Sequence, residues 1–374
     1  FQEIKNVDIV LSTYPLLGRD EEFLLPYQYH LLILDEAQNI KNPRAKASQV
    51  VRQIKAKHRL CLTGTPMENH LGELWSLFHF LMPGFLYSQE LFNKKYRNPI
   101  EKHADLQVKT KLISRIKPFM LRRLKTEVAK ELPEKTTIEV NIDMNEQQSK
   151  LYEAVRATMQ KNIRELIAAK GFHRSQIQIL SALLKLRQVC CHPSLLQLDQ
   201  VKNQNVESAK LDHLLEMVQD MVEEGRKILI FSQFTTMLQL IEEHLKALNI
   251  RNVKLTGQTK KRDEVITAFQ TGDIPVFLIS LKAGGVGLNL TAADTVIHYD
   301  PWWNPAAEDQ ASDRAWRIGQ DKPVFVYKLI TNQSIEEKIL ALQKNKADLA
   351  KSILSIDHEN EVKLSEDDVM SLLD

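Results

Sequence analysis

The order of apolar and polar positions along this chain predicts strands that alternate with helices. Short apolar runs at 31–34 and 59–62, and an alternating stretch at 7–12, have the pattern of strands. A helical pattern at 42–54 separates the two runs. Branched aliphatic runs of this kind suit parallel strands that helices cover on both faces. Residues 1–70 therefore predict part of an α/β lobe.

The stretch from 71 to 205 changes to the spacing of helices. Four apolar residues are spaced for one helix face: Leu74, Leu77, Phe78 and Leu81. Two longer helices are expected at 145–169 and 175–189, while 136–144 alternates as a strand or a linker. We therefore expect helices inserted between two lobes.

Strand and helix patterns alternate again beyond residue 205. The expected elements are helices at 210–223, 236–248 and 262–269, and strands at 227–231, 253–255 and 276–279. Such alternation predicts a second parallel sheet with right-handed crossovers. The expected parts are a first lobe at 1–70, helices and a linker at 71–135, a second helical part at 136–205, a second lobe at 206–333, and a closing helix with an acidic tail at 334–374. The closing helix has an apolar face for docking on a lobe: Ile335, Ile339, Leu342 and Leu349.

Composition narrows the class of protein. A chain of 374 residues that is 43% hydrophobic can bury two cores. No apolar run approaches the roughly 20 residues of a membrane helix, so we expect a soluble protein without a membrane partner. The formal net charge of +2 does not by itself indicate a nucleic-acid binder. Because the chain opens with Phe1, inside what reads as a domain, we expect a fragment of a longer protein.

The cysteines indicate neither disulfides nor a metal site. Cys61, Cys190 and Cys191 form no Cys-x-x-Cys pair, which fits a reducing interior and makes the cytoplasm the default compartment. Cys190, Cys191 and His192 are adjacent, and ligands must be spaced apart in the sequence to converge on one ion. We expect no metal there.

The strongest candidate chemistry follows the apolar run at 31–34. Asp35 and Glu36 come directly after it, and ligands of open α/β sheets collect beyond the carboxyl ends of such strands. Asp35 is a candidate Mg²⁺ ligand, and Glu36 is a candidate for orienting or deprotonating the water that attacks a γ-phosphate. The alternative is an ordinary strand-to-helix junction at which Asp35 caps the next helix.

A second strand tip lies close behind in the sequence. Thr63 and Thr65 supply hydroxyl groups, and Gly64 permits close backbone approach, as a loop that senses a phosphate or a carboxylate needs. The alternative is a plain glycine turn. Thr13, after the stretch at 7–12, is a candidate contact to a DNA backbone or simply a turn residue.

The second lobe has small polar residues and glycines at three strand tips. Backbone N–H groups at such tips can approach a phosphodiester, and a lysine adds positive charge. The candidate DNA contacts there are Ser232, Gln233, Gly257, Thr259, Ser280 and Lys282. Trp303 is a further candidate, because an exposed tryptophan can pack on a DNA sugar or base edge, whereas Trp302 is expected in the core.

Two arginines complement the acidic tip. Arg314 and Arg317 are three residues apart, so a helix would carry them on one face, where two guanidinium groups can meet γ-phosphate oxygens. Such a group stabilises the transition state of phosphoryl transfer as an arginine finger. The alternative is a surface pair that forms salt bridges with Asp309 and Asp313.

These motifs together resemble one family. LLILDEAQ followed by LTGTP, then KLRQVCCHPSLL, KILIFSQF and SLKAGGVGLNL with YDPWWNP, are similar to the ordered motifs of Swi/Snf-type DNA translocases, a family of superfamily-two helicase-like ATPases. The resemblance implies two RecA-like parallel-sheet lobes, the first incomplete, with helical protrusions. It also implies ATP and Mg²⁺ as cofactors and double-stranded DNA as partner. By the same resemblance, further residues bind nucleotide or couple it to DNA: Gln38, Gly285, Gly287 and Gln310. Trp316 departs from the family, which usually has His at that place.

The resemblance implies an ATP-dependent double-stranded DNA translocase of the chromatin-remodeller type. A DNA-bound protein complex, such as a polymerase or a nucleosome, is a further expected partner, and the expected location is the bacterial cytoplasm and nucleoid or the eukaryotic nucleus. Two alternatives stay open: a catalytically incomplete DNA-binding or scaffolding module, and an RNA-dependent helicase-type ATPase.

A phosphate-binding loop is missing from the chain. No glycine is followed by lysine, so the pattern GxxxxGK[ST] occurs nowhere in it. Without that loop the β- and γ-phosphates lose their main anchor. We therefore expect the isolated chain not to hydrolyse ATP at a useful rate, although its parent protein would. DNA-stimulated turnover by the isolated chain would contradict this.

Overall fold

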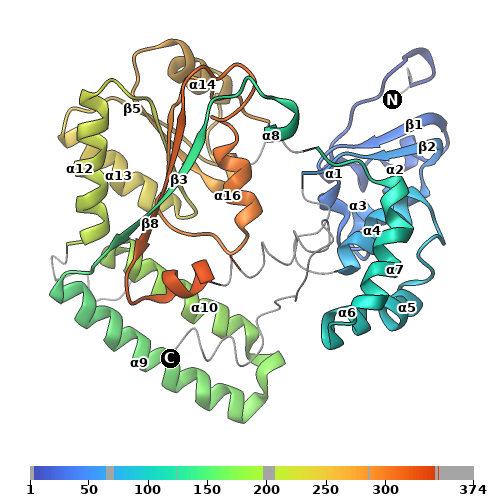
Figure 1. Ribbon diagram of the computed structural model, residues 1–374, viewed down its shortest axis with the longest axis horizontal. Coiled ribbons are helices and arrows are strands. Elements are labelled where there is room, and N and C mark those ends of the chain that lie inside the picture. The colour runs from blue at the N-terminus through green and yellow to red at the C-terminus, as the bar shows by residue number, and fades with distance from the viewer. Residues whose placement is uncertain are drawn as a thin grey trace. The chain divides into compact units, whose positions relative to one another are not determined.

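The computed structural model describes residues 4–64, 71–123, 125–196, 207–284, 287–341 and Lys344. The described residues fall into two compact units, one up to Leu121 and the other from Arg122 to Lys344 (Figure 1). Each unit has its own sheet and its own hydrophobic cores.

The first unit contains two parallel strands, β1 (Gln28–Leu34) and β2 (Lys55–Cys61), joined through α3 (Lys46–Gln53). Successive side chains of a strand point to opposite faces. Leu34 packs with Val50 of α3 in a buried core, whereas Leu31 and Ile33 are 45% and 49% exposed. The prediction that helices cover both faces is therefore wrong for the described residues, which cover one face only.

Two other local predictions differ from the structure. Residues 7–12 form no strand, and Ile9 and Leu11 lie exposed, because the described part of the unit offers no neighbouring strand to pair with them. The helix expected at 42–54 begins only at Lys46, after a 3₁₀ turn, η2 (Ala37–Ile40). The segment before β1 instead forms short helical turns: η1 (Ile4–Asn6), α1 (Tyr14–Leu17) and α2 (Glu21–Leu24).

The helix α4 (Leu71–Leu81) joins two cores of the first unit. Leu77 packs with the core beside β1, while Leu74 and Phe78 pack with the helices that follow. These helices and turns are α5 (Gln89–Phe92), the π-helical turn η3 (Asn93–Arg97), α6 (Asn98–His103), α7 (Leu106–Ile116) and η4 (Lys117–Phe119). A helix that contacts two cores is apolar nearly all round. The four apolar residues expected on one face therefore divide between two.

The second unit is built on a six-stranded, entirely parallel sheet of order β3-β8-β7-β4-β6-β5. Its strands are β3 (Lys135–Ile142), β4 (Ile228–Ser232), β5 (Asn252–Leu255), β6 (Val276–Ser280), β7 (Thr295–His298) and β8 (Val324–Thr331). This confirms the expected α/β class with parallel strands. The strands β7 and β8 were not among those predicted from the sequence.

Helices cover both faces of this sheet (Figure 1). Ile228 and Ile230 of β4 pack against α12 (Ala209–Glu223) and α13 (Thr235–Ala247). The alternate residues Leu229 and Phe231 pack in a second core that includes residues of α14 (Arg262–Thr271) and α16 (Pro305–Ser312). A strand buried on both faces reads as a continuous apolar run, as this one does.

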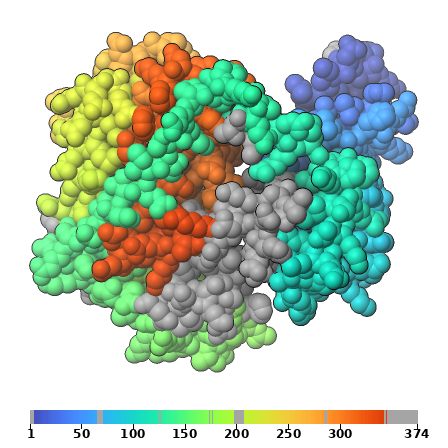
Figure 2. Space-filling model, viewed as in Figure 1, coloured from blue at the N-terminus to red at the C-terminus, as the bar shows by residue number. Residues whose placement is uncertain are grey.

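The helical insertion of the second unit begins only after β3. The expected helical part at 136–205 thus contains an edge strand of the second sheet, and β3 runs beside β8 along the surface (Figure 2). Two long helices follow, α9 (Glu146–Lys170) and α10 (Phe172–Cys191), close to their predicted bounds. The unit also contains the short helices α8 (Lys125–Val128) and α15 (Leu281–Gly284) and the 3₁₀ turn η5 (Pro193–Leu195).

Residues 335–341 are helical and begin the expected closing helix. Ile335 and Ile339 are fully buried against the helices α9 and α10, so at these two positions the helix docks on the helical insertion, whereas the prediction placed it on a lobe. Leu342 and Leu349 lie outside the described residues. None of the helices in the described ranges is long and apolar enough to cross a bilayer.

Candidate nucleotide and DNA sites

The acidic tip stands where β1 ends. The pairing with β2 continues past the strands, because Leu62 N donates to Leu34 O (2.8 Å) and Ala37 N donates to Leu62 O (2.9 Å). Glu36 has left-handed backbone angles (φ 49°, ψ 50°), which turn the chain sharply. Such a conformation costs free energy in a residue other than glycine and persists only where its surroundings hold it.

A chain of hydrogen bonds joins the two strand tips. Gln38 Nε2 donates to Glu36 Oε2 (2.7 Å), and Thr63 Oγ1 donates to Gln38 Oε1 (2.7 Å). The structure thus brings the acidic tip and the threonine tip together, with Gln38 as the bridge. Gly64 is exposed and faces open space, so no described neighbour requires a glycine there. Thr65 lies outside the described residues.

Asp35 does not cap the turn that follows it, and its carboxylate stays a candidate metal ligand. Its side chain is exposed, and its Oδ1 accepts from Glu36 N (2.9 Å). The 3₁₀ turn that follows has no side-chain cap. Hard carboxylate oxygens at an exposed tip fit Mg²⁺, which keeps several waters when it binds through one or two carboxylates. The backbone at Asp35 is fixed by Tyr14, whose hydroxyl donates to Asp35 O (2.7 Å).

The two candidate arginines lie in a turn. The helix α16 ends at Ser312, so the prediction that Arg314 and Arg317 share a helix face is wrong. The turn is closed from outside the helix, because Leu290 N donates to Arg314 O (3.0 Å) and Gln320 Nε2 donates to Ala315 O (3.0 Å). Arg314 is buried at 8% exposure, whereas Arg317 is exposed.

Two lysines near the start of the second unit form ion pairs with this turn. Lys125 and Lys135 donate to opposite oxygens of Asp313, at 2.8 and 3.0 Å. Both ammonium groups also lie over the Trp316 ring, at 5.3 and 4.8 Å from its centroid, and Trp316 Nε1 donates to Pro133 O (2.7 Å). Asp313 therefore pairs with lysines and not with the arginines of the predicted surface pair. Sequence reasoning missed this contact, and its one signal was a tryptophan at an unusual place.

The tips of β4 and β6 are less open than the sequence suggested. The Ser232 side chain is fully buried and donates to Asp300 Oδ1, and Ser280 is 4% exposed. Neither serine is therefore exposed for a DNA contact in this structure, so the prediction of Ser232 and Ser280 as DNA contacts is wrong, because both lie inside the sheet edge. Gln233 is half-buried, and Lys282 is exposed on α15.

The remaining candidates are scattered over both units. Thr13 is exposed before α1 and makes no capping hydrogen bond. Gly257 is exposed, and Thr259 Oγ1 accepts from Thr256 N (3.0 Å) within the same turn. The other sites are an exposed Gly287 with φ +50°, a half-buried Gln310 on α16, and Trp302 and Trp303, each half-buried against a different core. Gly285 lies outside the described residues.

Two protein-family models match most of the chain. The model described as "SNF2-related domain" matches residues 2–195, more than half of the 374 residues. The chain belongs to the SNF2-related family. The model described as "Helicase conserved C-terminal domain" matches residues 209–319. The first match of this SNF2 chain contains the acidic tip, and the second contains the arginine turn.

Known proteins similar to the SNF2 chain are much longer. It is 42% identical over 356 residues to a "Putative ATP-dependent helicase/translocase YwqA" of Bacillus subtilis, covering 94% of this chain and 38% of that protein. It is 33% identical over 383 residues to the human "SWI/SNF-related matrix-associated actin-dependent regulator of chromatin subfamily A member 1", covering 98% and 36%. A solved "Sulfolobus solfataricus SWI2/SNF2 ATPase core in complex with dsDNA" aligns at 38% identity and a TM-score of 0.49, covering 94% of this chain and 74% of that one. The SNF2 chain thus spans less than two fifths of these two longer relatives.

Proposed function

We propose that this SNF2 chain is part of an ATP-dependent translocase of double-stranded DNA. The observation that carries the proposal is the bonded series Glu36–Gln38–Thr63, which ties a candidate catalytic carboxylate to the neighbouring strand tip. A carboxylate held in this way is pre-positioned to orient water. Relatives named as ATP-dependent helicases support the same reaction.

Each candidate polar group described above has one proposed task. Asp35 would hold Mg²⁺, and Glu36 orients the attacking water and accepts a proton from it. When bound, Mg²⁺ supplies positive charge that offsets the charge on the phosphate oxygens. The exposed Arg317 is the group that reaches the γ-phosphate, and the buried Arg314 braces its turn. Gln38 and Thr63 couple the acidic tip to the rest of the lobe.

DNA is held mainly by its phosphates, so movement is largely independent of sequence. The groups available for this are exposed: Thr13, Gly257, Gly287 and Lys282. Gln233 adds a contact, and Trp303 packs on a sugar or base edge. A DNA-bound protein complex is the proposed target of the whole protein, because one similar relative is named as a regulator of chromatin.

The substitution Glu36→Gln in the full-length parent tests the reaction. It should lower DNA-stimulated ATP hydrolysis by about 10²-fold or more, in the range of general acid–base contributions, and leave DNA binding intact. Glu22→Gln removes the same charge from an exposed position of the same unit and should leave the rate unchanged.

Three results would overturn the proposal. An unchanged rate in Glu36→Gln would remove Glu36 from the reaction. Salt-dependent DNA binding that no nucleotide affects would instead indicate a scaffolding module. Stronger stimulation of ATP hydrolysis by RNA than by duplex DNA would indicate an RNA-dependent ATPase.

A further inference from the structure

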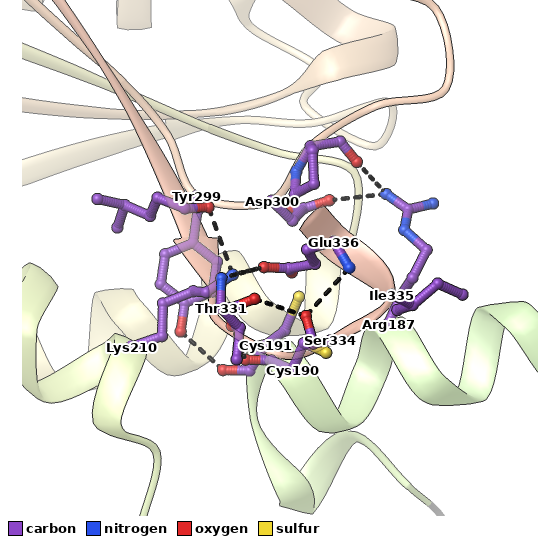
Figure 3. A network of polar contacts seen from close by, with 12 residues as sticks. Arg187, Cys190, Cys191, Lys210, Tyr299, Asp300, Thr331, Ser334, Ile335 and Glu336 are labelled. Atoms are coloured by element: carbon purple, nitrogen blue, oxygen red, sulfur yellow. Dashed lines mark hydrogen bonds and ion pairs between the residues drawn. The ribbon is translucent and has the colours of Figure 1, made fainter. Parts of the chain in front are cut away.

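A buried arginine of the helical insertion contacts two strand tips of the second sheet. Arg187 of α10 is 1% exposed. Its Nη1 donates to Gln233 Oε1 (2.9 Å). Its Nη2 donates to Pro301 O and lies 3.5 Å from Asp300 Oδ2, which Figure 3 shows beside Arg187. The proposed catalytic groups do not include this residue, so its burial calls for another reason.

The partners of Arg187 follow neighbouring strands. Gln233 comes directly after β4, and Asp300 and Pro301 come shortly after β7, which pairs with β4. Asp300 also ties the two tips together directly, because its Oδ1 accepts from the Ser232 hydroxyl and from Gln233 N (3.3 Å). Arg187 therefore closes a bridge between two loops that each carry a proposed DNA contact.

Aromatic rings surround the same guanidinium group. Its carbon lies 5.8 Å from the ring centroids of Phe234 and Trp302 and 5.5 Å from that of Trp303. A guanidinium at these distances is attracted to the ring faces. Arg187 thus contacts Trp303, the proposed packing surface for DNA, as well as Gln233. A hollow beside them is lined by Trp302, Trp303, Gln233 and apolar residues of α10.

Arg187 and Asp300 form a buried ion pair. Asp300 is fully buried; burial raises its pKa, while Arg187 and the Ser232 hydrogen bond act to lower it. A buried carboxylate of this kind needs its cation, and removing the cation leaves an uncompensated charge. The planar guanidinium bonds to Gln233, Asp300 and Pro301 from two nitrogens held in a fixed fork, whereas a lysine has one nitrogen and no such fork.

We propose that Arg187 is a positioning residue for DNA binding, which holds the Gln233 loop and Trp303 in the geometry that DNA contacts. The helical insertion thereby takes part in DNA binding without touching DNA through this residue. The inference rests on the proposed function, because it assumes that these two tips face DNA.

A second buried ion pair in the same unit provides a matched control. Lys210 of α12 pairs with Glu336, both almost without exposure, and Glu336 Oε2 also accepts from Thr331 N (2.8 Å) (Figure 3). Neither residue touches a proposed DNA contact in the described part of the chain. Arg187→Met and Lys210→Met therefore both remove a buried cation, but only Arg187→Met removes contacts with the loops that follow β4 and β7.

The experiment measures duplex-DNA affinity at one fixed salt concentration, together with thermal melting, in variants of the full-length parent. Arg187→Met should weaken DNA binding about tenfold, the order of one lost aromatic packing contact. Lys210→Met should lower the melting temperature without changing affinity.

Arg187→Lys keeps the charge but not the planar fork, so it should fold and lose affinity to an intermediate degree. With saturating DNA, kcat of Arg187→Met should stay near the parent value while KM for DNA rises.

A double-mutant cycle with Trp303→Ala separates positioning from stability. If Arg187 acts through Trp303, the double variant should bind DNA little worse than Trp303→Ala alone. Equal affinity losses in Arg187→Met and Lys210→Met, or fully additive losses in the cycle, would overturn the inference. Normal DNA binding by Trp303→Ala and Lys282→Ala would instead overturn the proposed DNA contacts themselves.

Discussion

The sheets of the two units have similar strand sequences and different surroundings. Leu31 to Leu34 in β1 and Ile228 to Phe231 in β4 are both runs of four apolar residues. In β4 all four are fully buried, whereas Leu31 and Ile33 stay about half exposed. An apolar run thus marks a strand, but its burial depends on what packs against each face.

The polar groups at the strand tips show the opposite difference in burial between the two units. In the first unit, Glu36, Gln38 and Thr63 bond to one another beside an exposed Asp35. In the second unit, Ser232 and Gln233 bond inward to Asp300 and Arg187. The first tip thus leaves a carboxylate exposed to solvent, while much of the second is internal structure that supports a few outward groups.

The largest expected effect concerns the exposed arginine. In the full-length parent, Arg317→Ala should lower kcat for ATP hydrolysis by about 10³-fold or more, the range found for arginine fingers. Arg251→Ala, at another exposed arginine of the second unit, should leave kcat unchanged. Equal rates in the two variants would show that the turn carries no catalytic group.

The contrast between the two sheets predicts unequal stability effects. Ile230→Ala removes a fully buried side chain and should lower the free energy of unfolding by about 2–5 kcal/mol. Ile33→Ala, at 49% exposure, should change it by about 1 kcal/mol or less. Urea unfolding of this chain measures both. A cost at Ile33 as large as that at Ile230 would mean that something covers the open face in solution.

Acid should destabilise the second unit through His298. Burial lowers the pKa of His298 to about 4. The nearby charges of Lys328 and Lys135 also lower this pKa, whereas the charge of Glu308 raises it. The Nε2 atom of His298 shares a hydrogen bond with Ser312 Oγ (2.8 Å). Between pH 6.5 and 4 the unfolded chain therefore binds a proton that the folded unit does not. Stability is complete above pH 6.5 and falls by about 1.4 kcal/mol per pH unit, or about 3 kcal/mol in all.

Unfolding measured at several pH values checks this slope. His298→Gln, which can still bond to Ser312, should flatten it. Part of the slope should remain, because burial also lowers the pKa of His192 to about 4. An unchanged slope in His298→Gln would show that His298 is not the group that titrates.

The smallest expected effect concerns the lysine contacts with Asp313. The two ion pairs are partly exposed, so Asp313→Asn should cost about 1 kcal/mol or less. In the full-length parent it should nevertheless lower ATP hydrolysis a few-fold, because the turn that carries Arg317 loses an anchor. High salt should reproduce the stability loss in the unaltered protein. A rate equal to that of the parent would separate the lysines from catalysis.

Local sequence determined the elements and the candidate chemistry. The helices α9, α10 and α12, the strands β4 to β6, and the carboxylates after β1 follow from periodicity and from the order of motifs, because these depend on neighbouring residues. The family also follows from that order. The resemblance found in the sequence agrees with the matched family model.

Only the tertiary structure decided which polar groups remain available. Ser232 is buried through a contact with Asp300, and Arg187 meets Asp300 from 113 positions away in the sequence. Leu290 N donates a hydrogen bond to Arg314 O in the turn, and Asp313 accepts one from Lys125, which lies 188 positions earlier in the sequence. Chain periodicity carries no information about such partners. The free energy of a buried charge or hydrogen bond depends on groups that folding alone brings together.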